Sequence, residues 1–150
     1  MQIAWIFPGQ GSQKLGMGKD VITLKDAKTR FDYASDVFGM DLFKICEEAG
    51  TSNETDLNNT KNTQISLFLV ESILLDALKL RGYNPDFVAG HSLGEITALY
   101  AAKVMSFENC VSLIKIRSEL MSKAPAGSMA ALIGFDRDML ESLVKKKDNI

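Results

Sequence analysis

Residues 87–95 read FVAGHSLGE, and Gly90, Ser92 and Gly94 within them fit the pattern G-x-S-x-G. Apolar residues precede the motif, and a helical pattern follows it across 95–104. A serine held in a sharp turn between a strand and a helix is typical of an enzyme nucleophile, whose hydroxyl is raised above the edge of the sheet. The stretch therefore predicts an α/β fold with a mainly parallel sheet and Ser92 at its carboxyl edge.

The two glycines of the motif have a steric purpose in this interpretation. Such a turn brings backbones close together, so the positions two before and two after the serine should lack bulk, as Gly90 and Gly94 do. The amide of Leu93, at the start of the following helix, is expected to point toward a developing oxyanion, where the helix dipole favours negative charge. The alternative is a strand-to-helix turn that contains Ser92 by chance.

The single histidine, His91, is adjacent to the serine but is a poor candidate for its base. Successive side chains leave an extended backbone on opposite sides, so His91 should point away from the Ser92 hydroxyl. We interpret His91 as a residue that supports the turn by packing or hydrogen bonding. The proton acceptor is then expected beyond residue 150.

The remaining elements follow from hydrophobic periodicity and from turn residues. The segment 51–62 is polar and predicts a surface connection, and 125–128 is the expected hinge. Strands are expected at 2–7, 87–90 and 129–135, and helices at 20–38, 41–49, 64–80, 95–104, 107–121 and 136–147, the last capped by Asp136. The helix 64–80 is apolar almost all round, which predicts that it is largely buried.

A second glycine-rich stretch, Gly9–Gln13, follows the first expected strand and should lie at the same sheet edge as the serine. It lacks the third glycine of G-x-G-x-x-G and has no G-K-[ST], so a phosphate cradle is the weaker interpretation. An oxyanion loop fits better, with the backbone amide of Gln10 as the second donor beside that of Leu93. A tight surface turn is the alternative.

Arg117 lies on the apolar side of the expected helix 107–121, with Phe107, Cys110 and Ile114. Burying a guanidinium without a partner is costly, so an anionic group is expected to meet it. A structural ion pair and a side chain that reaches out to water are two alternatives. With a nucleophile nearby, a substrate carboxylate is the third, because arginine binds carboxylates through a two-pronged fork.

The composition is that of an ordinary globular protein, with 46% hydrophobic and 24% charged residues among 150. The net charge is −2, and the basic residues form no patch along the sequence, which argues against nucleic acid as a partner. Cys46 and Cys110 lack metal-type spacing, so no zinc site or disulfide framework is expected. The first residues have neither a signal-peptide pattern nor a membrane span. We therefore expect a cytoplasmic protein with reduced thiols.

These stretches together resemble the malonyl-CoA:acyl-carrier-protein transacylases of fatty acid synthesis and the acyltransferase domains of polyketide synthases. The similar segments follow the family's order over nearly the whole chain. They are FPGQGSQ (7–13), NTQISLF (62–68), VAGHSLGEITALYAA (88–102), Arg117 in LIKIRSELM, and PAGSMAAL (125–132).

The resemblance implies an acyl transfer in which Ser92 attacks the malonyl thioester of coenzyme A. The amides of Gln10 and Leu93 would hold the oxyanion, Arg117 would bind the malonyl carboxylate, and Gln64 would have a supporting role. The acyl group would pass to the phosphopantetheine thiol of acyl carrier protein. No bound cofactor, metal, nucleic acid or membrane is implied, and the complete enzyme is expected to be a monomer.

The resemblance also implies a domain organisation. Residues 1–127 are expected to form part of a large hydrolase-like α/β subdomain, and 128–150 the incomplete start of a small ferredoxin-like one. Members of the family are considerably longer, and their catalytic histidine lies well beyond the equivalent of residue 150. The chain is accordingly expected to be an N-terminal portion with an exposed core, poorly soluble and inefficient in turnover on its own.

Two other classes of function remain open at this stage. A serine hydrolase, such as an esterase or thioesterase, would use the same turn with water as the acceptor. A non-catalytic acyl-binding module would keep the fold without the chemistry. The sequence does not distinguish malonyl from methylmalonyl substrates, or a free-standing enzyme from a domain of a larger synthase.

Overall fold

The computed structural model of the chain describes residues 2–125, 133–134 and 136–145. The strands are β1 (Ala4–Phe7) and β2 (Phe87–Gly90). The helices are α1 (Ala27–Phe38), α2 (Leu42–Glu47), α3 (Thr60–Leu80), α4 (Leu93–Ala101), α5 (Phe107–Ser122) and α6 (Arg137–Lys145). The expected strand 129–135 falls largely outside the described residues.

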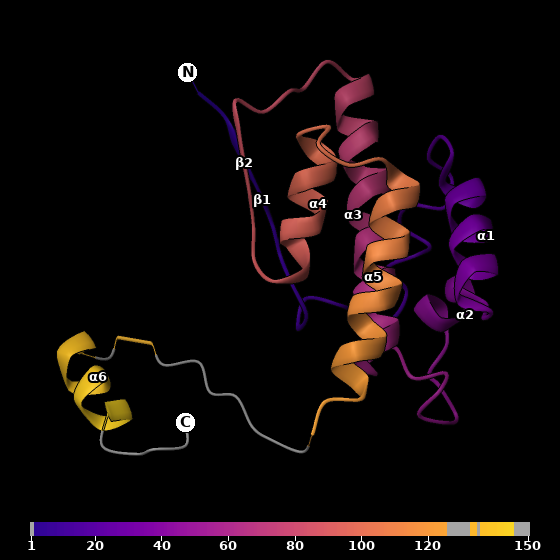
Figure 1. Cartoon of the computed structure of the whole chain (residues 1–150). Helices are drawn as coiled ribbons and strands as arrows, with labels where there is room; N and C mark the ends of the chain where they lie inside the picture. The colour runs from indigo at the N-terminus through magenta and orange to yellow at the C-terminus, as the bar shows by residue number, and fades with distance from the viewer. Residues whose placement is uncertain (1, 126–132, 135, 146–150) are drawn as a thin grey trace.

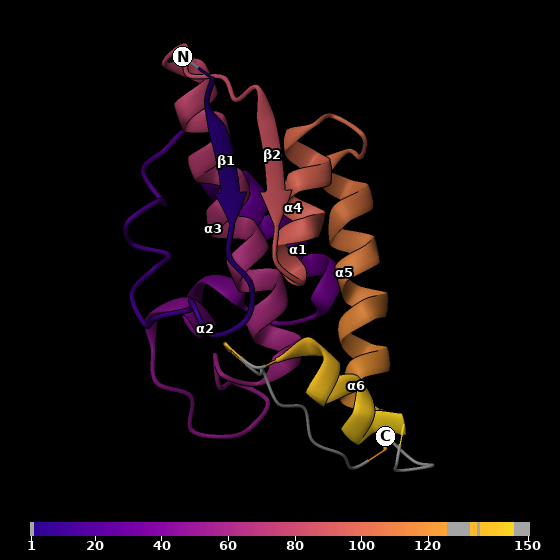
Figure 2. The same cartoon turned by 90° about the vertical axis from the view of Figure 1, so that its left-hand side faces the viewer.

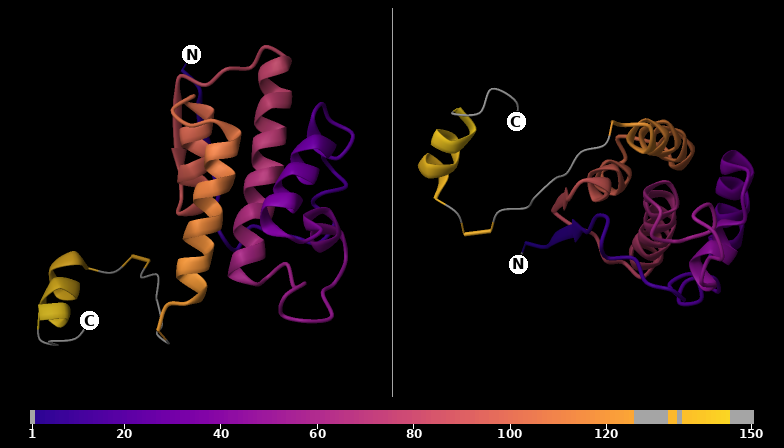
Figure 3. Two further views of the ribbon diagram at one scale, coloured as in Figure 1. Left: turned by 45° about the vertical axis from the view of Figure 1, so that its right-hand side comes forward. Right: turned by 90° about the horizontal axis from the view of Figure 1, so that it is seen from below.

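β1 and β2 form a parallel pair, with Ala4 opposite Phe87 and Phe7 opposite Gly90. Figure 1 shows this pair on one side of the molecule, α4, α3 and α5 beside it, and α1 and α2 on the far side. The view from below in Figure 3 shows the same succession, and in Figure 2 the strands lie in front of α4 and α3. The expected α/β fold with a parallel sheet is confirmed.

One face of the strand pair is exposed, although both strands have apolar sequences. Ile6 is 76% exposed and Phe87 is 57% exposed, whereas Phe7 is buried against Leu75 of α3 and Ala98 of α4. The reason is that a sheet has two faces and, among the described residues, the helices pack against one of them.

α3 occupies the centre of the helical layer, as its apolar sequence predicted, and packs against α1, α2, α4 and α5. Its buried stretch runs almost without interruption from Asn62 to Ile73. The helix begins where Asn59 accepts a hydrogen bond from the amide of Lys61 (2.9 Å), which satisfies one of the free donors of the first turn. This cap defines where α3 begins.

The helix expected at 20–38 is shorter in the structure and begins at Ala27. Residues before it form successive tight turns, such as Val21 N to Gly18 O (3.1 Å) and Leu24 N to Val21 O (2.9 Å), and the single α-helical bond from Ile22 N to Gly18 O (3.0 Å) is not continued. Asp26 has a left-handed backbone (φ 61°), which interrupts any helix that would run through it. The predicted end at residue 38 is confirmed, and Gly39 follows it with a left-handed backbone (φ 70°).

The other helix ends differ from the predicted ones by a few residues. α2 ends at Glu47, and α4 begins at Leu93, directly after the serine, and ends at Ala101. The cap predicted at Asp136 is confirmed, since its carboxylate accepts from the amide of Met139 (2.8 Å). Fraying and capping at helix ends depend on local bonds that periodicity does not report.

The polar segment 51–62 is not wholly a surface connection, as its composition had predicted. Its last three residues belong to α3, and Asn62 is buried. The Asn62 amide nitrogen donates to the carbonyl oxygens of Glu54 (2.8 Å) and Asp56 (2.9 Å). One buried side chain thus satisfies two carbonyl groups of the loop and fastens the loop to α3.

Asn62→Ala is expected to lower the free energy of unfolding by about 2 kcal/mol, because two loop carbonyls lose their donor inside the protein. Urea denaturation followed by circular dichroism measures this loss. The matched control is Asn53→Ala, the same substitution at an exposed position of the same loop, which should change stability by less than ~0.5 kcal/mol. Equal losses in the two variants would contradict the role of Asn62.

A buried carboxyl group lies between α3 and α4. Glu71 of α3 accepts a hydrogen bond from the hydroxyl of Thr97 of α4, and its side chain is otherwise enclosed. Burial raises the pKa of Glu71 from 4.5 to about 7, and the bond from Thr97 opposes this shift only partly. The fold therefore favours the neutral form of Glu71.

This shift predicts a specific dependence of stability on pH. Below pH 4.5 the group is protonated in both folded and unfolded chains, and above about pH 7 it is ionised in both. Between these values the folded state holds the extra proton, so the stabilisation by neutral Glu71 is lost as pH rises, by roughly 3 kcal/mol in total. Glu71→Gln should remove that loss, measured as the difference in unfolding free energy between wild type and variant at pH 4 and pH 8.

The control for this prediction is Glu95→Gln, because Glu95 is exposed on α4. Its difference from wild type should stay nearly constant over the same pH range. A difference for Glu71→Gln that is equally flat would show that the Glu71 carboxyl titrates alike in the folded and unfolded chains.

Candidate active site

The turn that carries Ser92 joins β2 directly to α4. Ser92 has φ 55° and ψ −105°, which a residue with a side chain adopts only under strain of about 1–3 kcal/mol. The amide of Gly94 donates to the His91 carbonyl (3.0 Å), and that of Glu95 donates to the Ser92 carbonyl (3.3 Å). The Ser92 side chain makes no capping bond to α4, so its hydroxyl is available to other groups.

Three glycines allow the backbones to meet at this turn. A Cβ at Gly90 would overlap the backbone of Gly94, and one at Gly94 would overlap the Phe7 carbonyl and lie 2.6 Å from the Pro8 oxygen. A Cβ at Gly9 would lie 2.5 Å from the His91 oxygen. The predicted need for small residues on both sides of Ser92 is confirmed, and it extends to the loop after β1.

Arg117 and Ser92 meet although 25 residues separate them. Arg117 Nη2 donates to Ser92 Oγ at 2.9 Å. Arg117 Nη1 donates to Oε1 of Gln64, whose side chain is fully buried on α3. The amide nitrogen of Gln64 in turn points to the sulfur of Met121 (3.4 Å). Three residues predicted for the site, Ser92, Arg117 and Gln64, are therefore joined in one chain of hydrogen bonds.

The partners of Arg117 correct one expectation. Arg117 is half-buried on the inward side of α5, as predicted, but its partners are an amide and a hydroxyl, and no carboxylate among the described residues forms an ion pair with it. Met121 on the same helix is 41% exposed, whereas Ser118 is buried and belongs to the inward face. No carboxylate of the described residues therefore occupies the guanidinium next to the serine.

The loop Gly9–Gln13 lies against the serine turn through Gly9 and is fastened to the start of α3. The Gln10 amide nitrogen Nε2 donates to Thr60 Oγ1 (3.2 Å), and Gln13 Nε2 donates to Asn58 Oδ1 (3.0 Å). Ser12 closes a tight turn on the Gly9 carbonyl (2.8 Å from Oγ). The tight turn and the oxyanion loop are therefore compatible descriptions of one segment.

The two backbone amides predicted for the oxyanion hole remain available. Within the described part of the chain, neither the Gln10 nitrogen nor the Leu93 nitrogen donates to a protein acceptor. The Leu93 side chain is buried, which holds the start of α4 in place. The role of both amides stays a prediction.

His91 contacts the loop after β1. Its amide donates to the Phe7 carbonyl (3.0 Å), and its ring lies next to Gly9, where an added Cβ would be 3.2 Å from Nδ1. The hydrogen bond that the Ser92 hydroxyl makes is to Arg117. This placement is the one expected for a residue that supports the turn.

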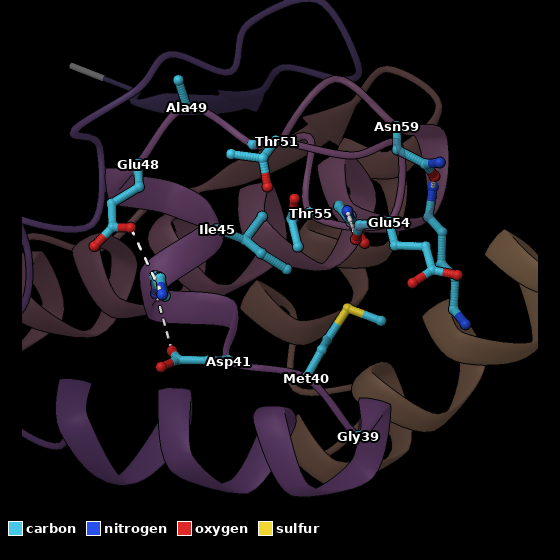
Figure 4. Close-up of a pocket in the computed structure, with 14 residues that line it drawn as sticks. Gly39, Met40, Asp41, Ile45, Glu48, Ala49, Thr51, Glu54, Thr55 and Asn59 are labelled. Atoms are coloured by element: carbon cyan, nitrogen blue, oxygen red, sulfur yellow. Dashed lines mark hydrogen bonds and ion pairs between the residues drawn. The ribbon is translucent and has the colours of Figure 1, made fainter.

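One cavity lies away from this group of residues. It has a volume of about 530 Å³ and is lined by α2, the loop after it and the start of α3. Figure 4 shows Ile45 and Met40 lying between Glu48 on one side and Glu54 on the other. The second, of about 290 Å³, lies near Lys79 and Phe87. Neither is lined by Ser92 or Arg117.

Other reactive groups give no competing centre in the residues described. Cys46 and Cys110 are buried and free, and burial raises the pKa of both thiols to about 11, so they stay protonated at neutral pH. No group of histidine, cysteine and acidic side chains in residues 2–125, 133–134 and 136–145 has the arrangement of a metal site. None of the helices in these residues is both long and apolar enough to cross a membrane.

Sequence reasoning did not find two of the residues that shape the site. Thr60 positions Gln10, and Met121 contacts Gln64. Met121 follows Arg117 by four residues, so the helical repeat could have placed it beside the guanidinium. Nothing in the sequence near Thr60 indicates its contact with a loop 50 residues earlier.

The geometry is that of an α/β protein with a serine held in a strained turn between a strand and a helix. Residues 4–150 match the family described as acyl transferase domain, and the chain belongs to this family. The malonyl CoA-acyl carrier protein transacylase of Synechocystis is 45% identical to it over 141 residues, which are 94% of this chain and 47% of that protein. The chain thus spans about half the length of the curated relatives it matches.

Solved structures agree with this assignment. The crystal structure of the Synechocystis malonyl-CoA:ACP transacylase is similar to this chain, with a TM-score of 0.87 and 43% identity. The match covers 99% of this chain and 49% of the Synechocystis chain. A second match is a malonyl-transacylase in complex with a type II polyketide synthase acyl-carrier protein. It covers 97% of this chain and 48% of its own, with a TM-score of 0.82 and 34% identity.

Proposed function

We propose that Ser92 is the nucleophile of an acyl transfer from malonyl-CoA to acyl carrier protein, in fatty acid biosynthesis. The observation that carries this proposal is the contact between Arg117 and the Ser92 hydroxyl (2.9 Å). A general esterase does not need a cation beside its nucleophile. An enzyme whose acyl group ends in a carboxylate does need one, because the cation binds that carboxylate. The names of the related transacylases support the same substrate.

Arg117 retains the donors that a carboxylate would need. A guanidinium has five N–H groups, and Gln64 and Ser92 use one each. The remaining donors suffice for the two-pronged bond to a carboxylate. Gln64 would hold the guanidinium in place, because its buried amide oxygen has a fixed position on α3.

The reaction has two half-steps. In the first, Ser92 Oγ forms a bond to the thioester carbonyl carbon, the carbon–sulfur bond breaks, and coenzyme A leaves as a thiol that takes up the serine proton. In the second, the phosphopantetheine thiol of acyl carrier protein attacks the serine ester, the carbon–oxygen bond breaks, and Ser92 regains a proton. The amides of Gln10 and Leu93 would stabilise the oxyanion of each tetrahedral intermediate.

A base must accept the serine proton, and His91 is not proposed for this role. It contacts the loop after β1, while the serine hydroxyl bonds to Arg117. Since His91 is the one histidine of the sequence, the proposal places the catalytic histidine outside residues 1–150. No bound cofactor is part of this chemistry.

The proposal includes the finer organisation expected from the resemblance. Residues 1–127 would belong to a large hydrolase-like subdomain, and 128–150 would begin a small ferredoxin-like one. Acyl carrier protein is the proposed partner, by analogy with the malonyl-transacylase that is solved in complex with such a protein. The proposed enzyme is monomeric and cytoplasmic.

The test is to incubate the protein, expressed from its natural reading frame, with malonyl-CoA and to analyse the peptide that contains Ser92 by mass spectrometry. A malonyl group on Ser92, absent from Ser92→Ala, is the expected result. Addition of the thiol form of acyl carrier protein should then remove the adduct and yield malonyl carrier protein.

Two other outcomes would overturn the proposal in different ways. Rapid release of free malonate without carrier protein would indicate a serine hydrolase. Tight binding of malonyl-CoA with no covalent adduct would indicate a non-catalytic acyl-binding module.

A further inference from the structure

The buried carboxyl group of Glu71 has an unusual environment. Its side chain is 9% exposed, and one carboxyl oxygen accepts from the hydroxyl of Thr97, which is fully buried on α4. The other oxygen, Oε1, is buried and has no hydrogen-bond partner in the described part of the chain. A buried carboxyl oxygen without a hydrogen-bond partner destabilises the folded state, so the position of Glu71 calls for an explanation.

Glu71 and Thr97 lie on α3 and α4, the helices that carry Gln64 and follow the serine turn. Thr97 follows Leu93, the first residue of α4, by four residues or about one helical turn. Glu71 follows Gln64 by seven residues or about two turns, which places both on one face of α3. The bond between Glu71 and Thr97 therefore joins α4, which begins directly after Ser92, to α3, which holds Arg117 through Gln64.

Two further polar links join α3 and α4, and both lie farther from the serine. The hydroxyl of Tyr100 donates to the Asp76 carboxylate (2.6 Å), and Lys79 Nζ donates to the Ala101 carbonyl (2.8 Å). Both are partly exposed to solvent. Among these three links, the one from Thr97 is the most buried and the nearest to Ser92.

We propose that Glu71 is a positioning residue, which holds α4 against α3 through Thr97 and so sets the position of Ser92 relative to Arg117 and Gln64. The inference rests on the proposed function of Ser92. Neutral Glu71 fits the enclosed site, whereas ionised Glu71 would leave a charged oxygen without a donor. Ionisation would therefore push the two helices apart near the serine turn.

The surroundings of Glu71 are compatible with both the neutral and the ionised carboxyl group near neutral pH. Burial raises its pKa to about 7, and no charged neighbour contributes to that shift. The charged side chains of neighbouring helices are engaged elsewhere: Arg30 with Asp76, Lys115 with the Val37 carbonyl and Arg117 with Gln64. Other titratable groups on the helices packed against α3 are Lys28, Asp32, Tyr33, Asp36, Lys44, Cys46, Glu47, Glu95, Tyr100, Glu108, Cys110 and Glu119.

The direct test is a pH titration of backbone amide shifts by nuclear magnetic resonance. In the wild type, the amides of Leu93 and Gly94 should show a step with its midpoint near pH 7. The step should vanish in Glu71→Gln and persist in Tyr100→Phe, which removes the link at the far end of the same helix pair. His91 is present in all three proteins, so only the part of the step that Glu71→Gln removes is assigned to Glu71.

A step that is unchanged in Glu71→Gln would overturn the proposal. If Glu71→Gln does not fold, Thr97→Val answers the same question, because it keeps the shape of the side chain and removes the bond. The step should then shrink at least twofold, and a step of unchanged size would count against the coupling.

The second arm measures the rate of Ser92 acylation by malonyl-CoA. Glu71→Leu and Thr97→Val should lower kcat about tenfold with KM unchanged, Glu71→Gln should restore most of the rate, and Tyr100→Phe should leave it unchanged. Equal losses in all four variants would mean that the helix pair matters only for stability. If wild-type Ser92 takes up no malonyl group, the proposed function fails, and the amide titration still decides whether Glu71 positions the turn.

Discussion

Arg117→Ala is expected to reduce the malonylation of Ser92 by about a thousandfold, while acetylation from acetyl-CoA falls less than about tenfold. Removing one member of a close charge pair costs about 2–5 kcal/mol, and about 4 kcal/mol corresponds to a factor of a thousand. Acetyl-CoA has no carboxylate to lose, so it loses only the single hydrogen bond from Arg117 to the serine, worth about 1 kcal/mol. The measurement is the single-turnover rate with each acyl donor.

Arg117→Lys distinguishes the charge from its geometry. Lysine keeps the positive charge, but its ammonium group cannot bond to Gln64 and at the same time offer a two-pronged bond to a carboxylate. Its malonylation rate should lie between those of the wild type and of Arg117→Ala. The matched control is Lys115→Ala, which removes a cation from the same helix where it bonds to the Val37 carbonyl and not to the site. It should leave both rates within about threefold.

Equal losses for malonyl and acetyl groups in Arg117→Ala would show that the arginine only supports the serine turn. Thermal unfolding of each variant must accompany the kinetics, because Arg117→Ala also leaves the buried oxygen of Gln64 without its donor. A loss of folded protein would lower both rates together, whereas loss of the carboxylate contact lowers one of them.

The position of Arg117 could be predicted from the sequence, and its partners could not. Helical periodicity places a residue on one side of a helix, so the inward direction of Arg117 followed from the spacing of its apolar neighbours. The identity of the partners depends on how α5 packs against α3 and against the serine turn. Gln64 and Ser92 are 53 and 25 residues away from Arg117 in the sequence. The role of Gln64 was available only through the resemblance.

The serine turn was predictable in more detail because its constraints are local. Gly90 follows from steric crowding inside the turn itself, because a Cβ there would overlap the backbone of Gly94. The crowding at Gly94 comes from Phe7 and Pro8, so the pattern of the motif predicts the small residue but not the atoms that require it. Glu71 could not be assigned in the same way: a single acidic residue in an apolar helix is equally consistent with an exposed position. Its burial depends on Thr97 being opposite, and no local pattern pairs these two residues.

Gly94→Ala is expected to lower the free energy of unfolding by more than about 4 kcal/mol, which is enough to unfold a marginally stable domain. The new Cβ would overlap the Phe7 carbonyl and lie 2.6 Å from the Pro8 oxygen. Both are backbone atoms, so no side-chain rotation relieves the overlap. Phe7 cannot move away without breaking its hydrogen bond to the His91 amide (3.0 Å) and its pairing with Gly90 across the sheet.

Gly16→Ala separates this crowding from the general effect of replacing a glycine. Gly16 has φ 85° and no atoms within 4 Å of an added Cβ, so the substitution adds backbone strain alone, about 1–2 kcal/mol. Urea denaturation of both variants measures the difference, which should exceed about 2 kcal/mol. Similar losses would mean that α4 can withdraw from β1 without cost. The proposed geometry at Ser92 would then lose its basis, because the close contact at Gly94 is what holds the first turn of α4, and with it the Leu93 amide, next to the loop that contains Gln10.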